Sequence, residues 1–343
     1  MRILPTSKPR IFITMGDPAG IGPEITAKSL ASPDIRGLAV FFVMVGDENV
    51  IRKAFGPARE RELFSCRFSF EEPGEIRLAE DRLNILDPGP ALNNVRPGET
   101  TAEGARKALE CITAAARMLE KEEGHCAMVT APVAKSAIAA VHPGFVGHTE
   151  FLQKIFSKEM VTMALIGNSL RVVPVTRHIP VHDIAKTLTA DLIIKTIRHV
   201  IGSLRIVAGK TDARIGVSAL NPHAGENGNI GREEIDIIVP AIDAIRADYP
   251  NIEGPIPADV IFHQALAKKI DVVISMYHDQ CLAPFKMVDF DNGVNVTLGL
   301  GHIRTSPDHG TAFDIAGKGL ASSGSMEHAI KLAVKSITCS TGE

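Results

Sequence analysis

The sequence predicts an α/β protein built on a mainly parallel sheet. Short apolar runs rich in β-branched residues alternate with amphipathic helical segments, which is the pattern of strands joined by helical crossovers. The chain of 343 residues exceeds the usual size of one hydrophobic core, so we expect two domains, or one large unit with a discontinuous second lobe. Hydrophobic residues make up 45% and charged residues 22%, which is typical of a soluble folded enzyme and not of a disordered chain.

Composition also excludes several classes of protein. The net charge of -3 gives no reason to expect a nucleic-acid or membrane partner. No apolar run approaches the roughly eighteen residues of a membrane span, and the N-terminus, MRILPTSKPR, lacks the apolar segment of a signal peptide. The five cysteines are odd in number and show no CxxC spacing, so neither a disulfide framework nor a thiolate zinc site is indicated. We therefore expect a cytoplasmic protein.

A glycine-rich segment, GDPAGIGPE (residues 16–24), follows an expected strand at residues 10–15 and precedes a helix expected at residues 25–30. Strand, glycine loop and helix in this order are typical of an anion-binding turn, because unpaired N–H groups and the helix dipole attract a phosphate or carboxylate. The spacing matches neither GxGxxG nor GxxxxGK[ST], so neither a Rossmann nor a P-loop site is predicted. A purely structural tight turn is an equal alternative.

The alternation continues along the chain. Further strands are expected at residues 38–45, 126–130 and 294–298, and helices at residues 101–120, 183–204 and 232–247. Residues 254–259, GPIPAD, are expected to form a proline-rich turn that presents the Asp259 carboxylate. A helix begins near His148 and Thr149, where Thr149 is either a ligand contact or a helix cap.

Three histidines stand just past expected strands. The strands are residues 171–176, 215–220 and 271–276, and the histidines are His178, His223 and His278. Ligands of open α/β sheets bind beyond the carboxyl ends of the strands, and neutral imidazole is the commonest protein ligand for a transition metal. Three nitrogens with open coordination positions would make a catalytic metal site. A shared metal and separately satisfied histidines are equal alternatives on this evidence.

Eight segments together resemble the 4-hydroxythreonine-4-phosphate dehydrogenases of pyridoxine biosynthesis. They occur in family order over residues 10–335: MGDPAGIGPE, TAPVAKS, GHTEFL, VTRHIP, NPHAGENGNIGREE, GPIPAD, YHDQ and GVNVTLGLGHIRTSPDHGTAFDIAGKG. Within the last of them, HGTAFDIAGKGLA is also similar to the HGSAPDIAGKGIA loop with which isopropylmalate dehydrogenases hold NAD. The chain departs from the commoner family text at Arg177, at Cys281 and at Gly301-His302.

The resemblance implies a two-lobed α/β/α fold like that of isocitrate and isopropylmalate dehydrogenases, with a central cleft. Residues 1–138 and 305–343 would form a discontinuous NAD-binding lobe, and residues 139–304 a lobe for the metal, the substrate and dimerisation. The family's site is shared between the subunits of a homodimer, with the position of His278 supplied by the partner.

The resemblance also assigns site residues. It implies that His178, His223 and His278 bind one divalent metal, which would be zinc, cobalt, manganese or magnesium. The implied substrate-binding residues are His148, Thr149, Lys286, Asn295 and Arg304, and the implied catalytic residues are Lys286, Asp259 and Asp279. The implied NAD-binding residues are His309, Gly310, Thr311, Ala312 and Asp314. An Asp314 carboxylate would accept a hydrogen bond from the ribose 2′-hydroxyl and repel a 2′-phosphate, so we expect NAD in preference to NADP.

The activity implied is the metal- and NAD-dependent oxidation of 4-phosphohydroxy-L-threonine to a 3-keto acid, which decarboxylates to 3-amino-2-oxopropyl phosphate on the route to pyridoxal phosphate, vitamin B6. The nearest alternative is a dehydrogenase of D-threonate or D-erythronate 4-phosphate in sugar-acid catabolism. A phosphate acyltransferase and a non-catalytic binding module are the alternatives from other classes. The histidine set and the DIAGKG loop argue against the acyltransferase, and the number of polar groups at strand ends argues against the binding module.

Overall fold

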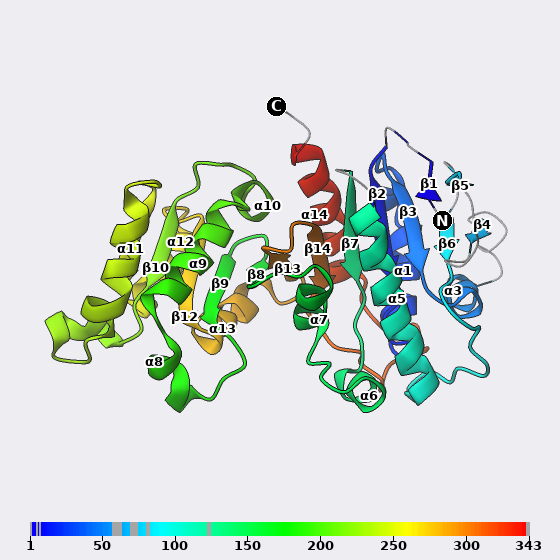
Figure 1. Ribbon diagram of the computed structural model, residues 1–343, viewed down its shortest axis with the longest axis horizontal. Coiled ribbons are helices and arrows are strands. Elements are labelled where there is room, and N and C mark those ends of the chain that lie inside the picture. Colours follow the sequence, from blue (N-terminus) through cyan, green and yellow to red (C-terminus); the bar gives the residue numbers. More distant parts are fainter. Residues whose placement is uncertain are drawn as a thin grey trace. The chain divides into compact units, whose positions relative to one another are not determined.

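The computed structural model describes residues 2–4, 6, 8–56, 64–68, 75–79, 83–121 and 125–340 (Figure 1). The chain forms two compact units, named here unit 1 (Met1–Glu159 and Leu300–Glu343) and unit 2 (Met160–Gly299). The division falls at different residues from the lobes expected above, since residues 139–159 and 300–304 belong to unit 1. The reason is that helix α7 (His148–Ile155) packs on α5 (Ala102–Lys121), and strand β14 (Ile303–Pro307) pairs with β7 (Cys126–Thr130).

Unit 1 is built on a parallel sheet in the order β14-β7-β2-β3-β6-β4. Its other strands are β2 (Arg10–Thr14), β3 (Phe41–Val45), β4 (Phe64–Phe68) and β6 (Leu83–Leu86), and a separate parallel pair is formed by β1 (Arg2–Ile3) and β5 (Glu75–Ile76). Every residue of β2 and β7 is buried, which explains why these strands read as continuous apolar runs in the sequence.

The helices of unit 1 fall into two groups by their contacts. Helix α5 packs on β2, β3 and β7. Helices α6 (Lys135–Val141) and α7 pack on α5, in a core that includes Ala105 and Ile138. Helix α14 (Gly324–Ser340) packs on β7 and β14 together with α1 (Gly22–Ala31). The shorter helices are α2 (Pro33–Arg36) and α3 (Glu48–Phe55).

Unit 2 has a mixed sheet in the order β11-β10-β12-β9-β8-β13. The strands are β8 (Thr162–Ile166), β9 (Arg171–Thr176), β10 (Ile215–Ser218), β11 (Ile252–Ile256), β12 (Val272–Tyr277) and β13 (Val294–Leu298). Strands β11, β10, β12 and β9 are parallel neighbours, whereas β8 is antiparallel to both β9 and β13. The four parallel strands therefore end at one edge of the sheet, which we call the carboxyl edge.

Helices cover both faces of this sheet. Val172 and Val273 point into a core formed with α12 (Ala258–Leu266) and α13 (His278–Asp289). The next residue of each strand, Val173 and Ile274, is also fully buried and points the other way, because side chains alternate along a strand. Helices α9 (Ala190–Ile201) and α11 (Val239–Arg246) are not part of the first core and pack on β9 and β11. The α/β class predicted from the sequence is thus confirmed.

Three expected elements differ in the structure. The single helix expected at residues 183–204 was wrong: the segment is broken into η1 (Val181–Asp183), α8 (Ile184–Thr187), α9 and α10 (Leu204–Ala208). The break occurs because Thr189 is extended and caps α9, accepting a hydrogen bond of 3.2 Å from Leu192 N. Residues 254–256 belong to β11 and not to a turn, and the helix expected at residues 232–247 is a π-helical turn, η3 (Glu234–Ile238), followed by α11.

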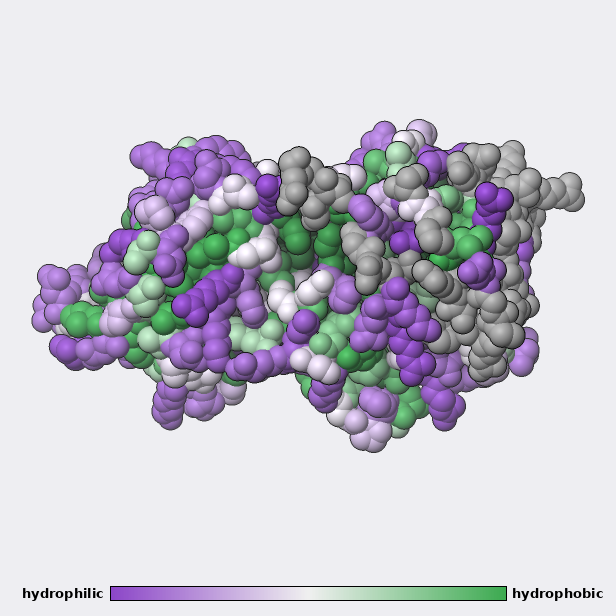
Figure 2. All heavy atoms as spheres, turned by 45° about the horizontal axis from the view of Figure 1, so that its top comes forward, coloured by the Kyte–Doolittle hydropathy of each residue, from purple (hydrophilic) through white to green (hydrophobic). Residues whose placement is uncertain are grey.

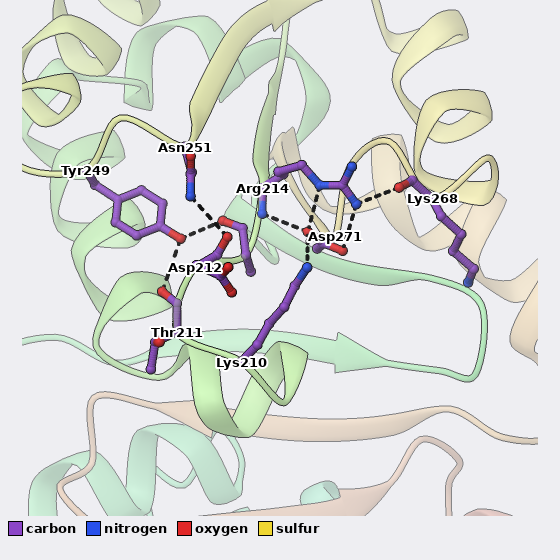
Figure 3. A network of polar contacts seen from close by, with 9 residues as sticks. Lys210, Thr211, Asp212, Arg214, Tyr249, Asn251, Lys268 and Asp271 are labelled. Carbon is purple, nitrogen blue, oxygen red and sulfur yellow. Dashed lines mark hydrogen bonds and ion pairs between the residues drawn. The ribbon is translucent and has the colours of Figure 1, made fainter.

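A polar network holds the opposite, amino edge of the unit 2 sheet (Figure 3). Arg214 precedes β10 and donates to the Asp271 carboxylate, which precedes β12, and Lys210 forms an ion pair of 2.9 Å with the same carboxylate. Burial raises the pKa of Asp271, but the hydrogen bonds from Arg214 and Lys210 outweigh it and leave that pKa below its ordinary value. Because Arg214 and Asp271 precede β10 and β12, these charges lie at the opposite end of the strands from the histidines.

No helix of the described residues is long and apolar enough to cross a membrane. On the face shown in Figure 2, hydrophilic residues form much of the surface, with hydrophobic residues between them.

Candidate functional site

The carboxyl edge of unit 2 brings two of the predicted histidines together. Thr176 of β9 and Tyr277 of β12 are partners in the sheet, and His178 and His278 follow them. The centroids of the two imidazole rings are 5.5 Å apart, with an angle of 52° between the ring planes. Nδ1 of His278 is 2.7 Å from Oδ1 of Asp279. A carboxylate on one ring nitrogen fixes the tautomer and orients the other nitrogen, which is how ligating histidines are commonly held.

His223 lies beyond the same edge, after β10, which is the other neighbour of β12. It is exposed and belongs to η2 (Pro222–Gly228). Within the part of the chain that the structure describes, no group of three His, Cys, Asp or Glu side chains is gathered closely enough to hold a metal ion. Two adjacent imidazoles nevertheless fit a divalent transition metal in the chemistry of their donor atoms.

The Gln280 side chain ties two of these strand ends to each other. Its Oε1 accepts a hydrogen bond from Met276 N at 2.7 Å, and its Nε2 donates to the Ala219 carbonyl, also at 2.7 Å. Ala219 directly follows β10, so this buried amide fixes the end of β10 against the start of α13, where His278 stands.

The remaining predicted residues of unit 2 are placed differently. Asp259 is exposed in the first turn of α12, which follows β11 and so begins near the carboxyl edge. Lys286 is half-buried on α13, with Nζ 5.1 Å from the centre of the Phe290 ring. Asn295 is not at this edge: it pairs with Leu165, and Leu165 pairs with Val172 near the start of β9. Its Oδ1 atom is buried without a hydrogen-bond partner among the described residues.

A second polar group lies in unit 1, where β7 and β14 are neighbours. Arg304 on β14 is 4% exposed, and its Nη2 donates to Thr130 Oγ1 at 2.6 Å. Burial lowers the pKa of this guanidinium to about 10, against an opposing effect of Glu150. The pKa of His148 is held well below its ordinary value of 6.5, mainly by burial and also by the positive charges of Arg304 and Lys135. His148 is thus neutral beside two cations, and its buried Nε2 has no hydrogen-bond partner among the described residues.

Sequence reasoning did not single out Lys135 as a site residue. It begins α6, the next element after β7, and a Cβ on Gly147 would lie 3.4 Å from its Cε. Its position in the segment TAPVAKS, just past a buried strand, could have indicated a site residue. The alternative that Thr149 caps α7 is wrong, because Gly147 is the N-cap residue and no side chain caps this helix.

The loop that carries the predicted NAD-binding residues packs against the glycine-rich segment. Thr311 accepts a hydrogen bond of 3.0 Å from Ile21 N, and a Cβ on Gly20 would lie 3.1 Å from the same carbonyl oxygen. Gly16 has φ of 75°, and a Cβ there would lie 2.3 Å from the Pro132 carbonyl oxygen. These close approaches favour the structural interpretation of the glycines, because Gly20 lets the segment approach Thr311 and Gly16 lets it approach Pro132.

Helix α1 anchors the far end of the same loop. Lys28 Nζ donates to the carbonyls of Gly319 and Ala321 at 2.8 and 2.7 Å, and Glu24 Oε1 accepts from Lys28 Nζ at 2.9 Å and from Ala321 N at 3.2 Å. A pocket of ≈ 330 Å³ lies between this loop, α1 and α3, with apolar walls that include Pro23 and Val50. Asp314 is exposed.

Two of the sequence departures have clear environments. Cys281 is fully buried in the core under α13, and burial raises the pKa of its thiol to about 12. His302 is half-buried, with its ring centre 4.6 Å from that of Phe156.

Buried parallel strands that lead to histidines, with a buried arginine on a neighbouring pair of strands, are typical of an α/β enzyme. Comparison with known proteins gives its family: the model of the pyridoxal phosphate biosynthetic protein PdxA matches residues 39–333. The chain belongs to the PdxA family and is an oxidoreductase.

The relatives support this assignment over nearly the whole chain. The 4-hydroxythreonine-4-phosphate dehydrogenase of Bradyrhizobium diazoefficiens is 40% identical, with 96% of this chain and 98% of the relative aligned. That of Geobacter metallireducens is 41% identical, with 97% and 96% aligned. The crystal structure of the Klebsiella pneumoniae enzyme of the same name superimposes with a TM-score of 0.82 at 38% identity, covering 97% of this chain and 99% of that one. A terephthalate 1,2-cis-dihydrodiol dehydrogenase from Burkholderia xenovorans has a TM-score of 0.67 at 28% identity, with 96% and 98% covered.

Proposed function

We propose that this enzyme oxidises 4-phosphohydroxy-L-threonine with NAD and one divalent metal, and that the 3-keto acid formed loses CO2 to give 3-amino-2-oxopropyl phosphate. The names of the relatives supply the substrate class. The observation that carries the proposal is the pair of imidazoles, His178 and His278, 5.5 Å apart at the ends of neighbouring parallel strands.

His178, His223 and His278 are the proposed metal ligands. A divalent metal there would act as a Lewis acid on the negative charge that develops on the substrate oxygen, while NAD accepts the hydride. Asp279 holds Nδ1 of His278 and so leaves Nε2 for coordination. One chain gathers no complete ligand group among its described residues, and we propose that the site is completed in a homodimer.

Arg304 and His148 are the proposed oxyanion-binding residues, with Thr149 beside them and Lys135 as an additional cation. Arg304 is suited to this role because its guanidinium is fixed by Thr130 and buried, where charge-assisted hydrogen bonds are strong. Neutral His148 contributes Nε2, which has no partner among the described side chains and backbone groups. We propose that Asn295, with its similarly unpaired Oδ1, contacts a polar group of the substrate.

Lys286 is proposed to move a proton at its Nζ, with Asp259 as a carboxylate near the carboxyl edge. An ammonium gives up its proton more readily near a bound cation, and general acid-base catalysis needs a pKa near the working pH. For NAD, the proposed contacts are His309, Gly310, Thr311, Ala312 and Asp314. The loop is anchored at Gly319 and Ala321, and the adjoining pocket leaves room for a heterocyclic ring. We propose a cytoplasmic location because the relatives are enzymes of metabolism.

The proposal is tested by NADH formation from the metal-loaded protein. We expect turnover of 4-phosphohydroxy-L-threonine that stops with a chelator and returns with added metal. His178→Ala should abolish it, whereas His182→Ala should not, because His182 is exposed and pairs only with its neighbour Asp183 among the described contacts.

D-threonate 4-phosphate serves as the second substrate in the same assay. Turnover of this compound alone would assign the enzyme to sugar-acid catabolism. Absence of NADH from both compounds would refute the dehydrogenase activity on these substrates.

A further inference from the structure

The backbone that carries His223 has an unusual conformation. The five consecutive residues 223–227 all have positive φ, between 44° and 77°, and only Gly225 among them is a glycine. Left-handed backbone is unfavourable for residues with a Cβ, because that atom approaches the following carbonyl oxygen. A run of this kind persists only where surrounding interactions hold it.

One buried carboxylate lies under this turn. Glu234 is 3% exposed and belongs to the π-helical turn η3. Its Oε1 accepts hydrogen bonds from the N–H groups of Leu220 and Asn221, both at 2.8 Å. Its Oε2 accepts from Asn221 Nδ2 at 2.9 Å. Glu234 therefore fixes the two residues that lead from β10 into the turn.

The turn and the carboxylate are in close contact. A Cβ on Gly225 would lie 2.7 Å from Glu234 Oε2, so only glycine lets the turn settle on this carboxylate. The turn is also closed on itself, since Ile230 N donates to the Gly225 carbonyl at 3.0 Å. An uncharged side chain at position 234 cannot supply three acceptor contacts of the same strength, because hydrogen bonds to a carboxylate are stronger than those to an amide.

We propose that Glu234 is a positioning residue: it holds the left-handed turn and thereby sets where the His223 imidazole stands at the carboxyl edge of unit 2. The inference rests on the proposed function, in which His223 binds the metal. Glu234 does not touch the metal or the substrate; it acts through Leu220, Asn221 and Gly225. Partners that orient a ligand in this way commonly change metal affinity by about 10- to 100-fold when removed.

The test compares Glu234→Gln with Asp236→Asn in the metal-free, full-length protein. Asp236 is a matched control, because it is a carboxylate of the same π-helical turn whose described hydrogen bonds go to Arg232 on the surface and not to Leu220 or Asn221. The first readout is the Kd of Co²⁺, followed by its visible absorption. The second, which needs no metal, is hydrogen exchange of the peptide that spans residues 219–229.

We expect Glu234→Gln to raise the Kd of Co²⁺ by about 10- to 100-fold and to speed exchange in that peptide, with both values unchanged in Asp236→Asn. A merely structural role would lower the melting temperature of Glu234→Gln and leave the Co²⁺ affinity of the folded protein as it was. That result, or unchanged exchange, would overturn the inference alone. His223→Ala is the reference: if it binds Co²⁺ as tightly as the unaltered protein, the proposed metal site fails and the role of Glu234 in it fails as well.

Discussion

Asp289 offers a sharp test of how unit 2 is held together. This carboxylate, at the end of α13, is 2% exposed. It accepts hydrogen bonds from the backbone N–H groups of Asn168, Ser169 and Leu170 at distances of 2.9 to 3.3 Å. A Cβ on Gly167 would lie 2.3 Å from Asp289 Cγ, so the β8–β9 turn sits directly on the carboxylate. The helix that begins with His278 is thereby tied to the hairpin whose second strand leads to His178.

Asp289→Asn replaces one acceptor oxygen by an NH2 group and removes the charge. The amide keeps one oxygen, so at least one N–H group of the turn then faces a donor. Hydrogen bonds to charged groups contribute about 1.5–3 kcal/mol, and a buried polar group left unsatisfied costs about 1–3 kcal/mol. We expect a loss of roughly 3 kcal/mol in the free energy of unfolding of unit 2, a large part of the roughly 5–15 kcal/mol typical of a domain.

Tyrosine fluorescence reports on the unfolding of unit 2. The chain has no Trp and two Tyr, Tyr249 and Tyr277, and both lie in unit 2. In urea we expect the midpoint to fall by about 1–2 M. The control, Asp291→Asn, alters an exposed carboxylate two residues further on and should change stability by less than about 0.5 kcal/mol. A loss below about 1 kcal/mol in Asp289→Asn would show that the turn does not depend on the charge.

Four further predictions concern both units. The pKa of Asp271 is lowered in the folded state, so its stabilising effect is complete above the unfolded value near 3.8 and is lost as the pH falls through the folded value. Asp271→Asn should therefore make the stability in acid, measured by tyrosine fluorescence, less dependent on pH. An unchanged dependence of stability on pH would contradict this prediction. Lys107 Nζ lies 2.6 Å from the buried Asp87 carboxylate. Lys107→Met leaves that carboxylate buried without its cation, so it should destabilise unit 1 by about 3–5 kcal/mol in calorimetry. A loss under about 1 kcal/mol would refute this. Lys28→Met should weaken NADH binding several-fold in a fluorescence titration, because it frees the end of the DIAGKG loop, and unchanged affinity would count against this anchor. Asp314→Lys should shift the ratio of kcat/KM for the two cofactors towards NADP, and a constant ratio would contradict the proposed ribose contact.

The candidate metal site shows where sequence reasoning succeeds and stops. An apolar run followed by a histidine is enough to place His178 and His278 at strand ends, because buried parallel strands are continuous in sequence and ligands gather at their carboxyl ends. Neither apolar run predicts that β9 pairs with β12, and this pairing puts the two imidazole rings side by side. Asn295 lies near the start of β13. Because β8 is antiparallel to both β9 and β13, those two strands run in the same direction, and Asn295 is level with the start of β9.

By itself, the sequence determined the α/β class, most strands and the family, since these depend on local hydrophobic pattern and on motifs contiguous in the chain. The tertiary structure decided which distant groups meet: Glu234 with the His223 turn, Asp289 with the β8–β9 turn, and Arg304 with Thr130. The physical reason is that a hydrogen bond between residues far apart in the chain depends on strand order and register, whereas a strand or helix is specified by the period of the residues within it.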